Sequence, residues 1–377
     1  MTAAAMPLPN DGAHHWRVSL PFVLLCVTVS RLIVLATAAY FAKDGDIGRA
    51  MCQWDCGWYS GIMARGYQPE ANAHPAGDAA NWAFFPFFPY MTRWLAALSG
   101  VDVLLTALAM NAVAFVGTCA MLYQYFLRIV GRDSAAFAVL LFAFCPLSLY
   151  FSAPYTESLF LFSIVAGVLL LQDGRFLMAG LAGAVASATR NSGFLFGFIY
   201  LAYAWHAWGG WRGMKALSPL NLRIVLGFLL VPVGLELYAL FLHSLMGDAL
   251  AFSHVQRAWG RVFSNPVTAL WSGLAAPGYL VRIRVVMVLI ALFGAWKAWR
   301  WGKRGEAIFC ALSILLPAST GSLDSLQRYV ATSLAFVFVL AWIAMRLPRA
   351  RWVLLGCFAL TTPWMVLRWT EGWYALP

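Results

Sequence analysis

Long apolar segments separated by short polar ones dominate the hydropathy pattern of this chain. An α-helix needs about 20 apolar residues to cross the hydrocarbon core of a bilayer. The pattern predicts eleven such helices, at residues 17–41, 103–127, 134–151, 156–172, 176–189, 192–208, 222–243, 280–299, 306–320, 328–346 and 352–368. The pair 176–189 and 192–208 is short, so it could form a broken helix or a re-entrant hairpin, which leaves a range of ten to thirteen spans.

Two longer polar segments interrupt this series, at residues 42–100 and 244–279. The first ends in an aromatic run with two prolines at 81–90, which cannot form a regular spanning helix and is expected to lie at the membrane interface. Residues 1–16 predict a disordered tail, and residues 17–377 a single transmembrane domain.

Composition supports the same fold class. The chain is 62% hydrophobic and only 11% charged, which excludes an ordinary soluble domain of 377 residues. Backbone groups inside a bilayer must be satisfied within helices or a closed barrel, and the short alternating strands of a barrel are not evident. The sequence therefore predicts an all-α polytopic membrane protein.

The formal net charge of +11 has an explanation in membrane topology. No basic nucleic-acid-binding module occurs, so nucleic acid is not an expected partner. Placing the N-terminus in the cytoplasm puts most Lys and Arg of the short loops inside, as topology rules favour. The segments 42–100 and 244–279 then face the periplasm or another exterior, and a bacterial inner membrane is the expected location.

Candidate chemistry starts with Asp55, which lies between aromatic residues in the first exterior segment. Such an acid can serve as a general base toward a sugar hydroxyl at the membrane surface. A plain ion pair with Arg49 or Arg65 is the alternative, and Asp44 and Asp46 are rival bases in the same segment.

The two cysteines beside this acid, Cys52 and Cys56, belong to an odd total of seven. They could form a disulfide in an oxidising compartment. A zinc site is not expected without a second Cys/His pair. We therefore expect no dedicated metal site, although the exterior acids leave a divalent cation possible.

Arginines at the exterior ends of predicted spans suit a lipid phosphate, because the guanidinium fork matches phosphate oxygens. The candidates for binding the phosphate of a lipid-linked sugar donor are Arg190, Arg328, Arg31 and Arg257. Those for substrate binding are Trp54, Trp58, Tyr59, Tyr155, Glu157, Asp248 and Gln256. Simpler explanations remain for some of them: Glu157 and Asp248 could be helix-capping acids, and Arg328 could extend outward to the interface.

Several motifs in order resemble the PIG-V-like mannosyltransferases, relatives of the second mannosyltransferase of GPI-anchor synthesis. The resemblance covers about residues 17–345 and rests on Trp54-Asp55-Cys56-Gly57-Trp58-Tyr59, Ala64-Arg65-Gly66-Tyr67, residues 84–89, Tyr155-Thr156-Glu157-Ser158, residues 188–193, Gly247-Asp248, residues 256–260 and Arg328-Tyr329. The chain has Gln53 and Asn191 where family members often carry Arg and Pro.

This resemblance implies a GT-C fold, a polyprenyl- or dolichyl-phosphate sugar donor, with mannose as the expected sugar, and Asp55 as the catalytic acidic residue. Together with the residues above, it predicts an inverting transfer of a hexose to a glycolipid or glycan acceptor on the exterior face. A lipid or solute transporter, such as a flippase, is the alternative from another class; a scaffold without activity is a third. No internal repeat of the transporter type is evident.

Overall fold

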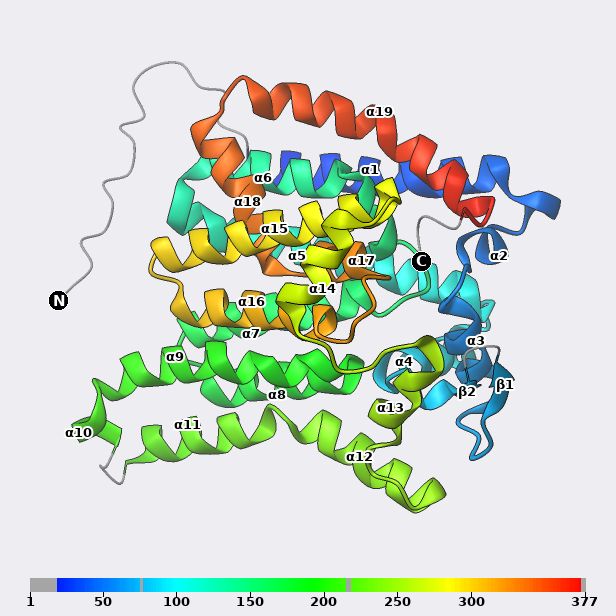
Figure 1. Cartoon of the computed structure of the whole chain (residues 1–377). Helices are drawn as coiled ribbons and strands as arrows, with labels where there is room; N and C mark the ends of the chain where they lie inside the picture. The colour runs from blue at the N-terminus through cyan, green and yellow to red at the C-terminus, as the bar shows by residue number, and fades with distance from the viewer. Residues whose placement is uncertain (1–18, 75–76, 215–217, 374–377) are drawn as a thin grey trace.

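Long helices stacked side by side form the body of the protein. The computed structural model describes residues 19–74, 77–214 and 218–373, so the tail predicted at 1–16 lies outside the described residues. Most of the long helices lie roughly along one axis, with α18 and α12 more oblique (Figure 1). They are α1 Leu20–Phe41, α5 Val103–Val130, α6 Arg132–Phe144, α7 Glu157–Gln172, α8 Phe176–Thr189, α9 Phe196–Trp208, α11 Pro219–Leu230, α12 Val233–Met246, α15 Tyr279–Arg300, α16 Arg304–Ala318, α18 Leu334–Arg346 and α19 Ala350–Thr370.

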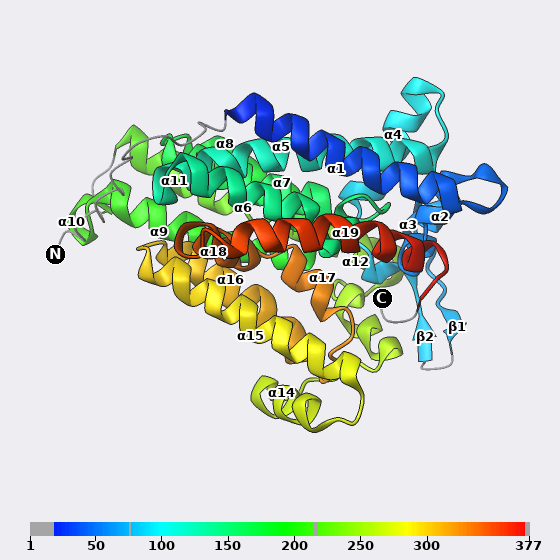
Figure 2. The ribbon, with the colours of Figure 1, turned by 90° about the horizontal axis from the view of Figure 1, so that it is seen from above.

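Shorter elements connect these helices. They are η1 Lys43–Gly45, α2 Ile47–Met51, α3 Cys56–Arg65, β1 Asn72–His74, β2 Gly77–Ala79, η2 Asn81–Ala83, α4 Phe87–Ser99, η3 Pro146–Phe151, η4 Asn191–Leu195, α10 Trp211–Met214, α13 Ala251–His254, η5 Val255–Trp259, α14 Pro266–Ala275 and α17 Leu326–Ala331, where η marks a 3-10 helix. The strands β1 and β2 form a small antiparallel hairpin. Figures 1 and 2 both place α2, α3, α4 and this hairpin at one end of the bundle, opposite α10.

The protein is an integral membrane protein with the expected all-helical fold class. Within the described ranges, four helices are long and apolar enough to cross a membrane: α1, α5, α15 and α19. The pair α11 and α12 adds a fifth if it is one bent span, and α7, α8 and α18 are shorter apolar helices. The predicted total of about eleven spans is larger than this set and stays a prediction.

Two predicted spans are interrupted. The span predicted at 222–243 divides into α11 and α12, bent by 41°, with Pro232 at the break. Proline has no N–H to donate and its ring obstructs the preceding turn, which explains the bend. The span predicted at 328–346 divides into α17 and α18, where the Ser333 hydroxyl accepts from the Ala335 amide and caps α18. Each break frees polar backbone at a helix end.

The break predicted between 176–189 and 192–208 is present. The helix α8 ends at Thr189, the 3-10 helix η4 follows, and α9 begins at Phe196. Gly193 permits the sharp connection, because a Cβ there would lie 2.2 Å from the Ala186 carbonyl carbon. Arg190 therefore stands at the turn between two packed helices.

Candidate functional site

Four ionisable side chains meet at the end of the bundle that carries α3. Asp55 precedes α3, Glu157 begins α7, Arg190 follows α8 and Arg328 lies in α17. Each residue lies in or beside the end of a helix, where the chain can direct a polar side chain away from an apolar helix face. We call these residues the charged cluster.

Three short ion-pair contacts join the cluster. The Nη1 atom of Arg328 lies 2.6 Å from Oδ2 of Asp55. The Nη1 atom of Arg190 lies 2.7 Å from Oε1 of Glu157. The Nε atom of Arg328 lies 3.1 Å from the same oxygen, close enough for an ion pair but not aligned for a hydrogen bond. Glu157 thus links the two arginines, and two acids balance two guanidinium groups.

Burial differs sharply within the cluster. Glu157 is 1% exposed, and Arg190 and Arg328 are each 8% exposed. The Asp55 side chain is 28% exposed. Burying charges is costly unless they are paired, and here each buried charge has an opposite partner. Asp55 is therefore the member of the cluster that faces solvent, and its Oδ1 atom has no hydrogen-bond partner among the described residues.

Aromatic rings line the arginines. The Arg328 guanidinium lies 4.9 Å from the centre of the Tyr155 ring, and the Arg190 guanidinium lies 4.9 Å from the centre of the Tyr329 ring. Cation–π contacts of this kind stabilise a partly desolvated arginine. The rings also fix the two forks in place while leaving their N–H groups directed at the acids.

The segment that carries Asp55 is tightly constrained. A disulfide joins Cys52 to Cys56 and closes a ring that contains Asp55. The sequence allowed this bond without requiring it. The ring spans the break between α2 and α3, so the two cysteines do not lie within one continuous helix, where a disulfide at this spacing would be awkward. Trp54, inside this ring, has a positive φ of 43°, which is unusual for a bulky residue. The backbone before Asp55 is therefore held in a strained conformation.

Neighbouring elements hold the same segment. The Tyr155 hydroxyl donates to the Gln53 carbonyl at 2.9 Å. The indole N–H of Trp369, in α19, donates to the Met51 carbonyl at 3.0 Å, and its ring lies edge-on to Trp54 at 4.8 Å. Trp369 is completely buried. Sequence reasoning missed this residue, because one Trp among 18 near the end of an apolar helix carries no distinctive signal.

Tyr59 packs behind the cluster. Its ring lies edge-on to Phe84 and Phe88, at 5.1 Å and 5.3 Å, and 6.4 Å from the Tyr155 ring. Burial, which is the largest influence, raises the pKa of the Tyr59 phenol, so it stays protonated at neutral pH. Tyr59 therefore packs beside the cluster, and its predicted contact with a substrate stays a prediction.

Arg31 occupies a different network from the one predicted. Its guanidinium donates to the carbonyls of Ala143 and Ser148 and to the hydroxyls of Ser30, Ser148 and Ser152. It also lies 4.4 Å from the centre of the Phe115 ring. These partners engage both Nη atoms of Arg31 and fasten α1 to the end of α6 and η3, while its buried Nε has no hydrogen-bond partner among the described residues. Arg31 thus lies in a network of its own, and its predicted role in phosphate binding stays a prediction.

The other predicted residues of the second exterior segment make local contacts. The Asp248 carboxylate contacts Nδ1 of His254 at 2.7 Å and accepts from the Leu250 amide. The His254 hydrogen bond holds the pKa of the Asp248 carboxyl below its usual value. Gln256 accepts from Arg261 at 2.6 Å, and Arg257 is exposed. In the described part of the chain, no hydrogen bond or ion pair joins these three predicted residues to the charged cluster.

Metal-binding potential is limited within the residues that the structure describes. There, no three His, Cys, Asp or Glu side chains gather in a way that could hold a metal ion. The acids of the charged cluster are instead paired with arginines.

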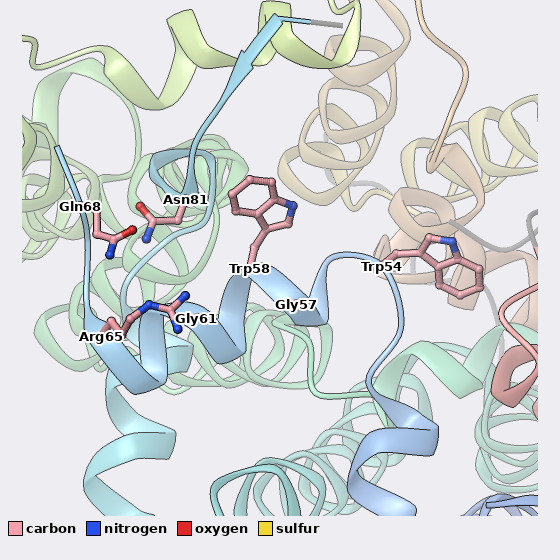
Figure 3. A pocket seen from close by; sticks show the side chains of 7 residues that line it. All are labelled: Trp54, Gly57, Trp58, Gly61, Arg65, Gln68 and Asn81. Carbon is pink, nitrogen blue, oxygen red and sulfur yellow. The ribbon is translucent and has the colours of Figure 1, made fainter. Parts of the chain in front are cut away.

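Two hollows lie near the cluster. The first, which we call the α3 pocket, has a volume of about 300 Å³ and is lined by Trp54, Gly57, Trp58, Gly61, Arg65, Gln68 and Asn81 (Figure 3). The second, which we call the apolar groove, has a volume of about 700 Å³ and is lined by Tyr67, Pro86, Phe87, Tyr90, Met91, Trp94, Ala188, Gly234, Leu237, Tyr238 and Phe241. The groove runs between α4, α8 and α12.

With this geometry in place, sequence comparison identifies similar enzymes, although no family profile matches the chain. GPI alpha-1,6-mannosyltransferase 2 of Cricetulus griseus is 29% identical over 160 residues, which cover 40% of this chain and 30% of that enzyme. GPI mannosyltransferase 2 of Aspergillus oryzae is 28% identical over 116 residues, covering 26% of this chain and 27% of that enzyme. The matched segments span less than a third of these relatives.

The resemblance to the PIG-V-like mannosyltransferases is confirmed. Solved structures show the fold. ArnT from Cupriavidus metallidurans, bound to undecaprenyl phosphate, matches with a TM-score of 0.53 and 17% identity over 89% of this chain and 62% of that one. An Archaeoglobus fulgidus oligosaccharyltransferase tethered to an acceptor peptide gives 0.50 and 13% over 93% and 55%. At such identities the likeness establishes the fold alone, which is GT-C-like as the sequence predicted.

Proposed function

We propose that this protein is an integral-membrane glycosyltransferase that transfers a hexose, with mannose expected from its relatives, from a polyprenyl-phosphate sugar to a glycolipid or glycan. The observation that carries the proposal is the charged cluster, in which Asp55 and Arg328 lie 2.6 Å apart beside buried Glu157 and Arg190. Such a site unites a solvent-facing acid with two guanidinium groups suited to a phosphate. The mannosyltransferase relatives and the GT-C-like fold support the same reaction class.

The proposed reaction gives each member of the cluster one role. Oδ1 of Asp55 accepts the proton of the acceptor hydroxyl while that oxygen forms a bond to the anomeric carbon. The bond from this carbon to the phosphate oxygen breaks, inverting the carbon, and the lipid phosphate leaves with the electron pair. Arg328 and Arg190 stabilise its negative charge. Glu157 holds both arginines in position.

The apolar groove offers a place for the polyprenyl chain. Its walls are aromatic and aliphatic, and Trp94 and Leu237 are among its exposed residues. Ala188, at one side of the groove, is two residues from Arg190. Gly234 lets α12 approach α8 closely there, since a Cβ would lie 2.2 Å from the Ala184 carbonyl oxygen. A chain in this groove would direct its phosphate toward the arginines.

Topology completes the proposal. Residues 17–377 form one transmembrane glycosyltransferase domain whose cluster faces the periplasm or equivalent exterior, with α3 and α4 at that surface. The positions of α3 and α10 at opposite ends of the bundle support this orientation, because basic residues 212–223 were predicted to lie inside (Figure 1). A bacterial inner membrane remains the proposed location.

Radiolabelled hexose transfer tests the function directly. Purified protein in lipid nanodiscs receives polyprenyl-phosphate [³H]mannose and a membrane glycolipid extract, and labelled product is separated from the donor. We expect product with the natural chain and none above background with Asp55→Asn. Asp44→Asn, which alters an exposed acid in the same segment, is the matched control and should remain active. Equal transfer by Asp55→Asn would remove Asp55 from the role of base. In sealed proteoliposomes, label that crosses the bilayer without transfer would favour a transporter.

A further inference from the structure

The α3 pocket has features that the donor site does not use. Trp54 and Gly57, on either side of Asp55 in the chain, both line it. Asp55 is therefore flanked in the chain by residues of this pocket, while its carboxylate contacts Arg328, the arginine assigned to the lipid phosphate. A base in a transfer reaction must reach the acceptor hydroxyl beside the donor carbon, so the pocket stands where an acceptor is needed.

Two glycines keep the pocket open. Gly57 and Gly61 are four residues apart and share one face of α3. A Cβ at Gly57 would meet nothing within 4 Å, and one at Gly61 would make only an ordinary contact with the Arg65 side chain. Neither glycine needs a positive φ. Glycine is a poor helix former, so packing and backbone geometry give no reason for glycine at these two positions. The need to keep the pocket beside α3 free of side chains is a reason for glycine at both positions.

The walls supply the groups that bind a sugar. Trp58 is stacked on Phe84 at 5.6 Å and lies edge-on to Trp259 at 5.8 Å, which makes it a rigid surface for the apolar face of a hexose. Asn81 donates to the Gly66 carbonyl, and its buried Oδ1 has no hydrogen-bond partner in the described structure. Figure 3 shows Asn81 and Gln68 on one side of Trp58 and Trp54 on the other.

Arg65 adds a positive charge to the same pocket. It is exposed, and no carboxylate of the described residues pairs with it. An unpaired guanidinium beside hydroxyl-binding amides suits a sugar that carries a phosphate or a carboxylate. A volume of about 300 Å³ corresponds to about ten water molecules at about 30 Å³ each, which is room for one hexose with its anionic group.

We infer that the α3 pocket is the acceptor subsite and that it takes a hexose bearing an anionic group. This inference rests on the proposed function, because it assigns the second substrate of that reaction. Trp58 packs against the sugar, Gln68 and Asn81 bind its hydroxyls, and Arg65 binds the anion. The sugar hydroxyl that reacts is then presented to Asp55 from the side opposite Arg328.

Ligand-observed NMR titration of the full chain in nanodiscs tests the inference. The probes are mannose 6-phosphate, glucuronic acid and mannose. We expect both anionic sugars to bind more tightly than mannose, and the tighter of the two identifies phosphate or carboxylate as the recognised group. Arg65→Ala should weaken anionic-sugar binding about ten-fold, as expected when a charge-assisted contact is lost, and Arg65→Lys should weaken it less. Gly57→Leu, which fills the pocket, should abolish it.

Matched controls separate the pocket from general effects. Arg93→Ala removes another exposed arginine, on α4, and Gly356→Leu adds a leucine where a Cβ meets nothing within 4 Å, on α19. Both should bind the probes as the natural chain does. Unchanged binding by Arg65→Ala and Gly57→Leu, or equal affinity for mannose and the anionic sugars, would overturn the inference.

A parallel titration with undecaprenyl phosphate distinguishes failure of the inference from failure of the proposed function. Undecaprenyl phosphate that binds normally, with no sensitivity of anionic-sugar binding to Arg65, rejects the subsite and leaves the function standing. Sugar binding that depends on Arg65 in a protein without affinity for undecaprenyl phosphate rejects the donor site and keeps the pocket as an anionic-sugar site.

Discussion

Asp55→Asn should stop transfer and strengthen binding of the lipid phosphate. In the structure, the two acids and two arginines of the charged cluster are balanced, and Nη1 of Arg328 contacts Asp55 at 2.6 Å. We expect a phosphate that binds Nη1 of Arg328 to displace the Asp55 carboxylate. The amide of Asn keeps the shape of the side chain but gives up the negative charge, so the phosphate has no charged competitor.

The size of the effect follows from the contact that is exchanged. A hydrogen bond to a charged group contributes about 1.5–3 kcal/mol, which is about ten- to a hundred-fold in an equilibrium constant. Asp55 is 28% exposed, so water screens part of its attraction to Arg328. The lower end of the range applies, and we expect undecaprenyl phosphate to bind Asp55→Asn about ten-fold more tightly than the natural chain.

Isothermal titration calorimetry of undecaprenyl phosphate into protein nanodiscs measures this change. Arg328→Ala serves as the comparison with the opposite expected result, and it should bind undecaprenyl phosphate less tightly. If Asp55→Asn bound the lipid phosphate no more tightly, while Arg328→Ala bound it less tightly, competition between Asp55 and the phosphate would be wrong. If both variants kept the natural affinity, Arg328 would not be part of the phosphate site.

Three further changes test the surrounding structure. Glu157→Gln leaves two buried guanidinium groups with one acid and should lower the free energy of unfolding by about 3–5 kcal/mol in denaturant titration, whereas exposed Glu236→Gln should change it little. Cys52→Ser opens a ring of five residues and should lower local stability by about 2 kcal/mol, read as faster amide exchange around Asp55 and reduced transfer; unchanged exchange would contradict the positioning role of the ring. Arg31→Met should lower the melting temperature and leave undecaprenyl phosphate affinity unchanged, because the Nη atoms of Arg31 bind carbonyls and serines; weaker lipid binding in a protein with normal melting would instead support Arg31 as part of the donor site.

The sequence was informative about which residues would be costly in a membrane. Arg190 and Arg328 stand out because ionisable groups are rare in apolar segments and expensive to bury. Glu157 carries a weaker signal, because an acid at the start of a helix is often a capping residue. Their meeting with Asp55 depends on the packing of α3, α7, α8 and α17, which no periodic pattern specifies. The identity of the cluster was thus predictable residue by residue, and its connectivity was not.

Other predicted site residues make local contacts that the sequence did not predict. Arg31 carries the same signal as Arg328, a cation in an apolar segment, but its Nη atoms bind a carbonyl and a serine hydroxyl near the end of α6. Asp248 has a histidine six residues away, and this local pair forms without any tertiary partner. The bend at Pro232 was hidden in an unbroken apolar run, since hydropathy does not record a missing N–H. Charge and hydropathy thus identify the polar side chains of a site. The hydrogen-bond partners that these side chains find in the folded protein cannot be predicted from either.

The backbone is strained next to both members of the Asp55–Arg328 pair. Trp54 has a φ of 43° and Ser325 a φ of 62°, and neither is a glycine. Left-handed conformations of such residues cost about 1–3 kcal/mol each and persist where the surroundings enforce them. The disulfide ring and Trp369 enforce the first, and the ion pair ties its segment to the second. A phosphate that replaces Asp55 on Arg328 would remove the ion pair as a restraint. In the proposed reaction, donor binding therefore frees the Asp55 carboxylate to accept the proton of the acceptor hydroxyl.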